Sequence, residues 1–115
     1  MSDINKNGIE IRKKEKSLSI LGNANRLKIL YLLARTEGKL NFNQIAKELE
    51  IDKNKLSYHI ALLKNNKFII NEVRPDREGR KFSFYNVSRK GVNAINLIEK
   101  IDDNIEDDLK KLETL

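Results

Sequence analysis

The stretch from Asp52 to Leu63, DKNKLSYHIALL, has the pattern of a short helix with two unlike faces. The Asp52 carboxylate can accept hydrogen bonds from the free N–H groups of a first helical turn, so we expect the helix to begin at Lys53. At about 100° per residue, Leu56, Ile60 and Leu63 share a stripe that can pack into a core. The other side carries Asn54, Tyr58, Ala61 and Asn65, with Lys53, Ser57 and Lys64 on its shoulder. That cationic, amide-rich face suits phosphates and base edges, and it contains no catalytic pair.

The composition indicates one soluble domain without enzyme chemistry. The chain has 115 residues, of which 35% are charged and 39% apolar, which allows one modest core. No apolar run approaches the roughly 18 residues that span a bilayer, and the N-terminus has no signal core, so we expect a cytoplasmic protein. With no Cys and a single His, thiolate and His-based metal sites are excluded. No Gly-rich phosphate loop or nucleophile with a base is visible, and we expect no enzyme, cofactor or metal.

Charge is distributed unevenly along the chain. The net charge of +6 and the pI near 9.6 favour a polyanionic partner. Residues 101–115 contain six acids and two lysines, whereas the first hundred residues carry 21 basic and 11 acidic groups. Such a separation is expected where one end of a molecule faces phosphate. The alternative is a lysine-rich solvated surface, and charge alone does not decide between the two.

The N-terminal third predicts two helices after a polar arm. Residues 1–10 form the arm, and apolar residues then recur at helical spacing from Ile9 to Gly22, which can supply a left-handed stop. A second helix follows Asn23 or the next residues and ends near Gly38.

A helix-turn-helix follows. Leu40 can form a short strand, and Asn41 with Gln44 three residues later has the spacing of a capping box. The two-turn helix that it opens runs through Ile45, Ala46 and Leu49 and ends at Glu50-Ile51. A connection of about four residues then leads to the helix of residues 53–64. Two short helices so joined, the second with an exposed polar face, are typical of a helix-turn-helix.

Two strand-like runs at residues 68–74 and 81–87 predict a hairpin directly after the helix-turn-helix. Pro75 and Gly79 are expected to make its turn. Its cations are Arg74, Arg77, Arg80 and Lys81. We therefore predict a mainly α fold with a small β-hairpin (α+β), in which residues 11–90 form a winged helix-turn-helix domain.

Residues 88–115 predict a long C-terminal helix, capped by Ser88. About 26 residues at 1.5 Å each give a rod of roughly 40 Å, too long to bury against so small a domain. We interpret it as a dimerisation helix; the alternative is a helix folded back on its own core. Its apolar residues recur at three- and four-residue spacing, with Asp108 at the one polar position of the series: Ala94, Ile98, Ile101, Ile105, Leu112 and Leu115. Four acids could hold a hard cation, but this spacing is more typical of a solvated helix face: Asp102, Asp103, Glu106 and Asp107.

Several segments resemble the ArsR-type winged-helix transcription regulators. They are LGNANRLKIL at residues 21–30, QIA with Leu49, KLSYHIALL at 55–63, and Gly79-Arg-Lys before Phe84-Tyr85, within residues 18–90. The resemblance implies a homodimer on operator DNA, with the helix of residues 53–64 in the major groove and the wing over the adjacent minor groove or backbone. It also implies a dimer interface from the first and last helices, for which we select Ile11, Leu18, Ile98, Ile101, Ile105 and Leu112.

The chain departs from the metal-sensing members of that family. Those members carry cysteines in the short helix before the turn, or carboxylate and His pairs on the last helix. Here residues 42–46 read FNQIA and the last helix contains no His, so no metal site is carried over. A small-molecule effector stays unspecified.

The candidate DNA contacts fall into three sets. Asn54 and Tyr58 are assigned to base edges, whereas the lysines are assigned to phosphates, which position without specifying sequence. We expect His59, beside the buried stripe, to make a structural hydrogen bond. On the recognition helix the contacts are Lys53, Asn54, Lys55, Ser57, Tyr58 and Lys64; on the wing they are Arg74, Arg77, Arg80 and Lys81; for the DNA backbone they are Asn23 and Arg26.

The sequence thus predicts a homodimeric regulator of transcription that binds double-stranded DNA sequence-specifically. The alternative is a winged-helix protein–protein adaptor in a transcription or replication assembly. A DNA binder loses about 0.9 log units of affinity per log unit of salt for each phosphate contact, whereas an apolar adaptor barely responds.

Overall fold

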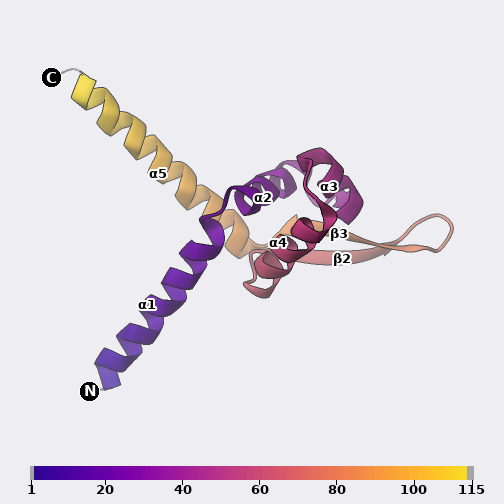
Figure 1. The fold of residues 1–115 in the computed structure, drawn as a ribbon, viewed down its shortest axis with the longest axis horizontal. Helices are drawn as coiled ribbons and strands as arrows, with labels where there is room; N and C mark the ends of the chain where they lie inside the picture. The colour runs from indigo at the N-terminus through magenta and orange to yellow at the C-terminus, as the bar shows by residue number, and fades with distance from the viewer. Residues whose placement is uncertain (1, 114–115) are drawn as a thin grey trace.

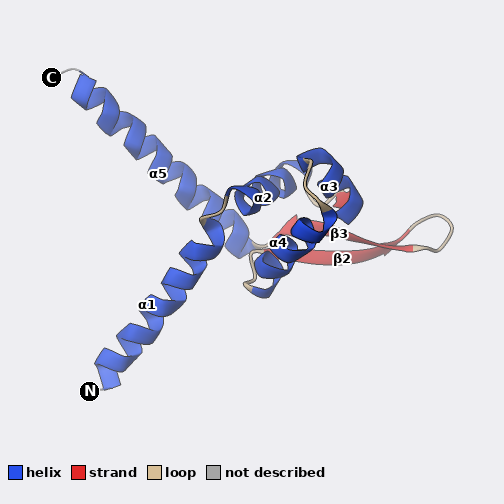
Figure 2. Cartoon of the chain, viewed as in Figure 1, coloured by secondary structure: helices blue, strands red, loops and turns tan. Residues whose placement is uncertain are grey.

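The computed structural model describes residues 2–113, with side chains for residues 8–103 and 109–112. The elements, in chain order, are α1 (Ser2–Leu21), α2 (Ala24–Thr36), β1 (Leu40–Asn41), α3 (Phe42–Leu49), α4 (Lys53–Asn65), β2 (Ile69–Pro75), β3 (Lys81–Val87) and α5 (Arg89–Glu113). Figure 2 shows that helices dominate, with the strands confined to one side of the central part. No helix in this part of the chain is long and apolar enough to cross a membrane.

The strands form a small antiparallel sheet in the order β1-β3-β2. The hairpin is regular along its length, because Ile69 pairs with Val87 at its base and Pro75 with Lys81 at its tip. The short strand expected at Leu40 is confirmed, and it adds to β3 opposite Tyr85. The predicted fold class, mainly α with a small β-hairpin, is therefore confirmed, with β1 as a third strand.

The hydrophobic core joins α2, α3 and α4 to the base of the hairpin. The most deeply buried side chains come from all four parts: Ile29, Leu30, Leu33, Ile45, Leu56, Leu63, Phe68 and Ile69. Among the described side chains of the long helices, only Ile20 of α1 and Ala94 of α5 are buried members of this core. The elements from α2 to β3 thus pack together as the winged-helix part. The helix α1 is attached to this part near its C-terminal end, and α5 near its N-terminal end.

The rest of α1 and α5 extends away from that core as two diverging arms (Figure 1). The molecule measures 61 × 48 × 24 Å, and its radius of gyration is 17.8 Å. A compact domain of this length has a radius of gyration of about 13 Å. The long C-terminal helix therefore does not fold back on its own core, contrary to the alternative considered from the sequence.

Two expectations for α1 were wrong. The helix begins at Ser2, not near Ile9, because a polar segment on an extended arm needs no apolar face to remain helical. Gly22 does not adopt the left-handed conformation. Instead its N–H donates to the carbonyl of Leu18 at 2.8 Å, and Asn23 follows at once as the cap of α2.

The start of α5 is fastened to the end of α4. Ser88 Oγ accepts from the N–H of Gly91 at 3.0 Å, which confirms the predicted cap. The Lys90 ammonium donates to the carbonyl of Asn66, the C-cap of α4, at 2.8 Å and lies 4.4 Å from the centre of the Phe68 ring. A Cβ atom at Gly91 would collide with the carbonyl oxygen of Phe68, so only glycine fits this close approach.

Candidate nucleic-acid interface

The helix α4 is fixed at its first turn as the sequence predicted. Asp52 is its N-cap and accepts from the N–H groups of Asn54 at 2.9 Å and Lys55 at 3.3 Å. Leu56 and Leu63 have no exposed surface, so the predicted inward face is confirmed. The core and the cap together hold α4 in one orientation.

The opposite face of α4 is open. Tyr58 is 60% exposed, and Asn54 is also exposed. Among the described residues, no ion pair or side-chain hydrogen bond engages the side chains of the six candidates on this face. All six are exposed: Lys53, Asn54, Lys55, Ser57, Tyr58 and Lys64. Their donors and acceptors are therefore available to a partner.

His59 lies on the buried side of α4, and its predicted structural hydrogen bond is confirmed. The ring is only 8% exposed, and its Nδ1 lies 3.1 Å from Nη1 of Arg26. Burial lowers the pKa of His59, and the positive charges of Arg26 and Lys55 lower it further.

Arg26, expected on the DNA backbone, is turned into the protein. Besides His59, its Nε donates to the carbonyl of Ile20 at 2.6 Å. Because these bonds occupy the guanidinium, we leave Arg26 out of the proposed DNA contacts. Asn23, the other residue of that pair, caps α2 by accepting from the N–H of Arg26 at 3.1 Å.

Near the tip end of β2, Arg74 is engaged by the protein itself. Its Nη2 donates to the carbonyl of Gly38 at 2.9 Å, and its guanidinium lies 4.7 Å from the centre of the Phe84 ring. Glu72 lies 3.4 Å from its Nε. Arg74 therefore fastens the hairpin to the loop before β1.

At the tip of the wing, Arg80 is paired with two acids that our sequence reasoning did not use. Its Nη2 lies 2.6 Å from Glu78 and its Nε 3.2 Å from Asp76. Asp76 also shapes the turn by accepting from the N–H groups of Glu78 and Arg80, with Gly79 at φ 82°. Pro75 ends β2 and so precedes this turn. The sequence did contain a signal for these ion pairs, because Asp76 and Glu78 stand four and two residues before Arg80.

The other two wing cations remain open. Arg77 and Lys81 are exposed, and no acid within the described ranges forms an ion pair with either. All four cations predicted for the wing are exposed, but two of them are paired within the protein and two have no ion-pair partner among the described residues.

The arms expose most of the apolar residues expected at a dimer interface. Ile11 is 61% exposed, Leu18 69%, Ile101 57% and Leu112 66%, while Ile98 is half-buried. The side chain of Ile105 lies outside the described residues, as do those of Glu106 and Asp107. Where side chains are described, no group of acids or His could hold a metal ion.

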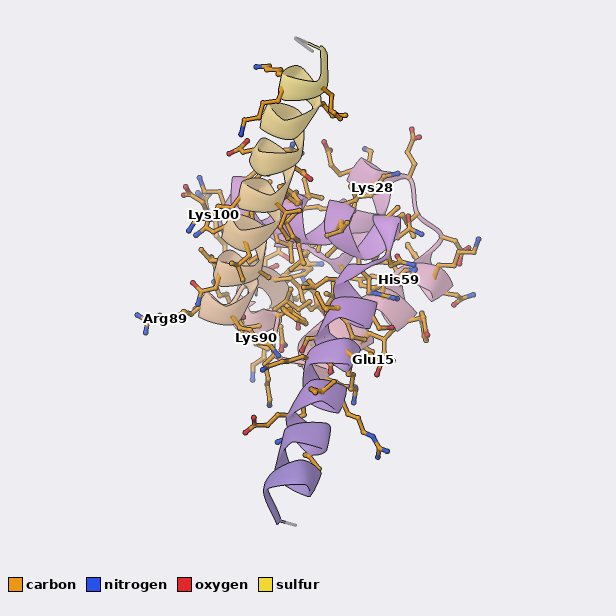
Figure 3. The ribbon with its side chains drawn as sticks, turned by 90° about the vertical axis from the view of Figure 1, so that its left-hand side faces the viewer. Glu15, Lys28, His59, Arg89, Lys90 and Lys100 are labelled. Carbon is orange, nitrogen blue, oxygen red and sulfur yellow. The ribbon has the colours of Figure 1, made fainter. Side chains whose placement is uncertain are left out.

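A groove of about 520 Å³ lies between the arms at their junction. Leu18 and Leu21 of α1, Leu97 and Ile98 of α5, and Phe68 contribute its apolar walls. Lys90 also lines it, whereas Arg89 beside it points away from the molecule (Figure 3). The groove continues the exposed apolar surface of both arms.

A helix-turn-helix with an antiparallel hairpin behind it defines a winged-helix protein. Residues 23–70, from the cap of α2 to the start of the wing, match the family model described as bacterial regulatory protein, arsR family. The resemblance to this family that was read from the sequence is therefore confirmed over residues 23–70. No curated protein matches the chain in sequence.

Solved structures extend the likeness to the arms. A transcriptional regulator homologue from Pyrococcus horikoshii is 27% identical, with a TM-score of 0.68 over 84% of this chain and 94% of that one. Reduced HlyU from Vibrio cholerae is 24% identical, with a TM-score of 0.62 over 88% and 97%. A MepR mutant from S. aureus bound to an oligodeoxyribonucleotide is 19% identical, with a TM-score of 0.65 over 95% and 81%.

Proposed function

We propose that this chain is a homodimeric regulator of transcription that binds double-stranded DNA sequence-specifically, with α4 in the major groove. The observation that carries the proposal is the open face of α4, where six exposed polar or cationic side chains have no partner among the described residues. The similarity in fold to the MepR mutant, which is bound to an oligodeoxyribonucleotide, supports the choice of DNA as partner. A regulator of this kind acts in the cytoplasm, and no cofactor or metal enters the proposal.

Each open side chain has a role that follows from its chemistry. The Asn54 amide can pair with both hydrogen-bonding atoms of an adenine edge, and Tyr58 can donate to a base or a phosphate. Lys53, Lys55 and Lys64 neutralise phosphates, and Ser57 donates to one. On the wing, contact to the backbone or the minor groove falls to Arg77 and Lys81, since the other two arginines are occupied.

Dimerisation through the arms explains their exposed apolar side chains. Isolated apolar residues are normal on a surface, but both arms display several of them, and Leu18, Leu97 and Ile98 also line the groove at their junction. The arms also differ in charge, with Lys13, Lys14 and Lys16 on α1 and Asp102 and Asp103 on α5. Packing α1 of one copy against α5 of another would bury the apolar stripes and bring these opposite charges together. Two recognition helices would then address half-sites about 34 Å apart.

Selection of duplexes from a random pool tests the DNA partner. We expect enrichment of a palindrome, and an affinity that falls by about 0.9 log units per log unit of salt for each phosphate contact. No enrichment, together with affinity for proteins that hardly responds to salt, would contradict the proposal and favour the adaptor alternative.

A pair of neighbouring variants on α5 tests the dimer. Leu97→Glu places a charge on an apolar side chain that is 61% exposed, whereas Asn96→Glu adds the same charge at an exposed polar position. We expect sedimentation to show a monomer for Leu97→Glu and a dimer for Asn96→Glu. A dimer in both variants would move the interface elsewhere.

A further inference from the structure

We propose that Arg26 is a positioning residue for DNA recognition, because its guanidinium bridges the last turn of α1 to His59 and so holds α4 in its binding orientation. This inference rests on the proposed function. It assigns to Arg26 a role through α4, in place of the direct contact with the DNA backbone expected from the sequence.

The bridge joins three helices at one side chain. Arg26 extends from the first turn of α2; its Nε donates to the carbonyl of Ile20 at 2.6 Å and its Nη2 to that of Ser19 at 3.4 Å. Its Nη1 lies 3.1 Å from Nδ1 of His59 on α4. In Figure 3, His59 lies close to the C-terminal part of α1. The planar guanidinium fixes the directions of all three hydrogen bonds together, which a single ammonium group cannot do.

The two ends of the bridge are chemically matched. The carbonyls of Ser19 and Ile20 belong to the last turn of α1, where carbonyl groups lack partners within the helix and a positive charge is favourable. At the other end, a guanidinium can only donate, so Nδ1 of His59 must accept and carries no proton. The ring is therefore neutral, with its proton on Nε2.

Protonation of His59 would break the bridge. The added proton would sit on Nδ1 and point at the guanidinium, so an acceptor would become a second donor and a second positive charge. The charged groups that act on the ring are Arg26 from α2 and Lys55 from α4, both cationic, while α1 contributes only carbonyls to this junction. Together with burial they lower the pKa of His59 from its ordinary value, which favours the neutral ring that the bridge requires.

The position of His59 makes the bridge relevant to base contacts. His59 directly follows Tyr58, whose ring lies 5.4 Å from the His59 ring, and it stands one turn after Lys55. Tyr58 and Lys55 are exposed candidates for DNA contact, whereas His59 is buried. Hydrogen bonds to base edges need donor–acceptor distances of about 2.7–3.2 Å, so a small rotation of α4 costs sequence discrimination.

Binding of the duplex enriched by the wild-type protein tests this role. Arg26→Met keeps the length of the side chain but removes its donors, and we expect about tenfold weaker binding with an unchanged salt slope. Lys28→Met is the matched control, because it removes one positive charge from an exposed site on the same helix, and it should bind within about twofold of wild type. Wild-type affinity in Arg26→Met, or a salt slope smaller by about 0.9, would overturn the proposal.

The pH dependence supplies a readout that does not require Arg26→Met to fold. For the wild type we expect the affinity ratio between the enriched and an unrelated duplex to stay constant around neutral pH and to fall several-fold only on the acid side of the ordinary imidazole value of about 6.5, because the pKa of His59 is lowered. His59→Asn keeps an acceptor near the Nδ1 position and does not titrate, so its ratio should stay constant at the neutral wild-type value. A constant ratio in the wild type, or the same fall in His59→Asn, would overturn the proposal. Failure of the wild type to enrich any duplex would instead overturn the proposed function itself.

Discussion

The recognition helix and the wing look equally basic in the sequence, but they differ in how much of that charge is available. On α4 the cations Lys53, Lys55 and Lys64 have no ion-pair partner among the described residues. On the wing, Arg74 and Arg80 are held by carboxylates, a ring and a carbonyl of the protein itself. The helix therefore presents nearly all of its charge to a partner, whereas the wing presents about half.

The difference follows from where the acids lie. Between Asp52 and Glu72 the chain contains no Asp or Glu, and Asp52 itself is used as the helix cap. In the wing, by contrast, Asp76 and Glu78 stand within four residues of Arg80, and the turn brings all three together. The number of cations in a segment thus overstates its capacity to bind phosphate wherever acids share the same turn.

The largest expected effect is on α4. Asn54→Ala and Tyr58→Ala should each reduce discrimination between the enriched and an unrelated duplex by about 1–3 kcal/mol, because base contacts are lost. Competition binding measures this. Lys28→Met, at an exposed position of α2, serves as a control. An equal loss on both duplexes would assign these side chains to phosphates, and α4 would then read no sequence.

The cap of α4 should come next. Asp52→Ala should lower the free energy of unfolding by about 1 kcal/mol, because the N–H groups of Asn54 and Lys55 lose their acceptor. Asp52→Asn keeps an acceptor oxygen and should retain most of the stability. Urea denaturation measures both variants, and equal losses would mean that the charge matters more than the hydrogen bonds.

For Arg74 on β2 we expect a loss of stability of similar size. Arg74→Met removes the hydrogen bond to Gly38 and the contact with Phe84, and it should cost about 0.5–1.5 kcal/mol in urea denaturation. Lys81→Met, on the neighbouring strand, removes a cation without a described partner and should have little effect on stability. If Arg74→Met instead weakened DNA binding with no change in stability, Arg74 would belong with the open cations.

The smallest effect separates the two arginines of the wing tip. Arg77→Ala should weaken binding to all duplexes alike and reduce the salt slope by about 1, because one phosphate contact is lost. Arg80→Ala should leave the slope unchanged, since the exposed ion pairs with Asp76 and Glu78 already neutralise it. A larger effect from Arg80→Ala would show that these ion pairs open on DNA.

Features determined by neighbours in the chain could be predicted from the sequence. The Asp52 cap, the inward stripe with Leu56 and the pairing of Asn41 with Gln44 all depend on residues within one or two turns. The hairpin followed from two strand-like runs around a turn. Each of these signals lies within a few residues, so no tertiary contact had to be known.

The engagement of the arginines could not be predicted in the same way. Arg26 meets His59 across 33 positions and Arg74 meets Gly38 across 36, so neither contact leaves a local pattern. The sequence assigns Arg26 to the DNA backbone because a helix N-terminus offers free N–H groups, and it assigns Arg74 to DNA because Arg74 belongs to a basic hairpin. Only the packing of α2 against α4, and of the hairpin against the loop before β1, reveals that these side chains are occupied.

The tight joint at Gly91 has a consequence for the geometry of an operator. With Lys90 holding the C-cap of α4 and Gly91 pressed against the backbone at Phe68, the direction in which α5 leaves is tied to the direction of the recognition helix. In the proposed dimer, the two rigidly attached α5 helices would set the separation and the relative rotation of the two α4 helices. One base pair inserted between half-sites turns one site by about 35° relative to the other. A dimer whose α5 helices are rigidly attached to α4 could not accommodate that rotation.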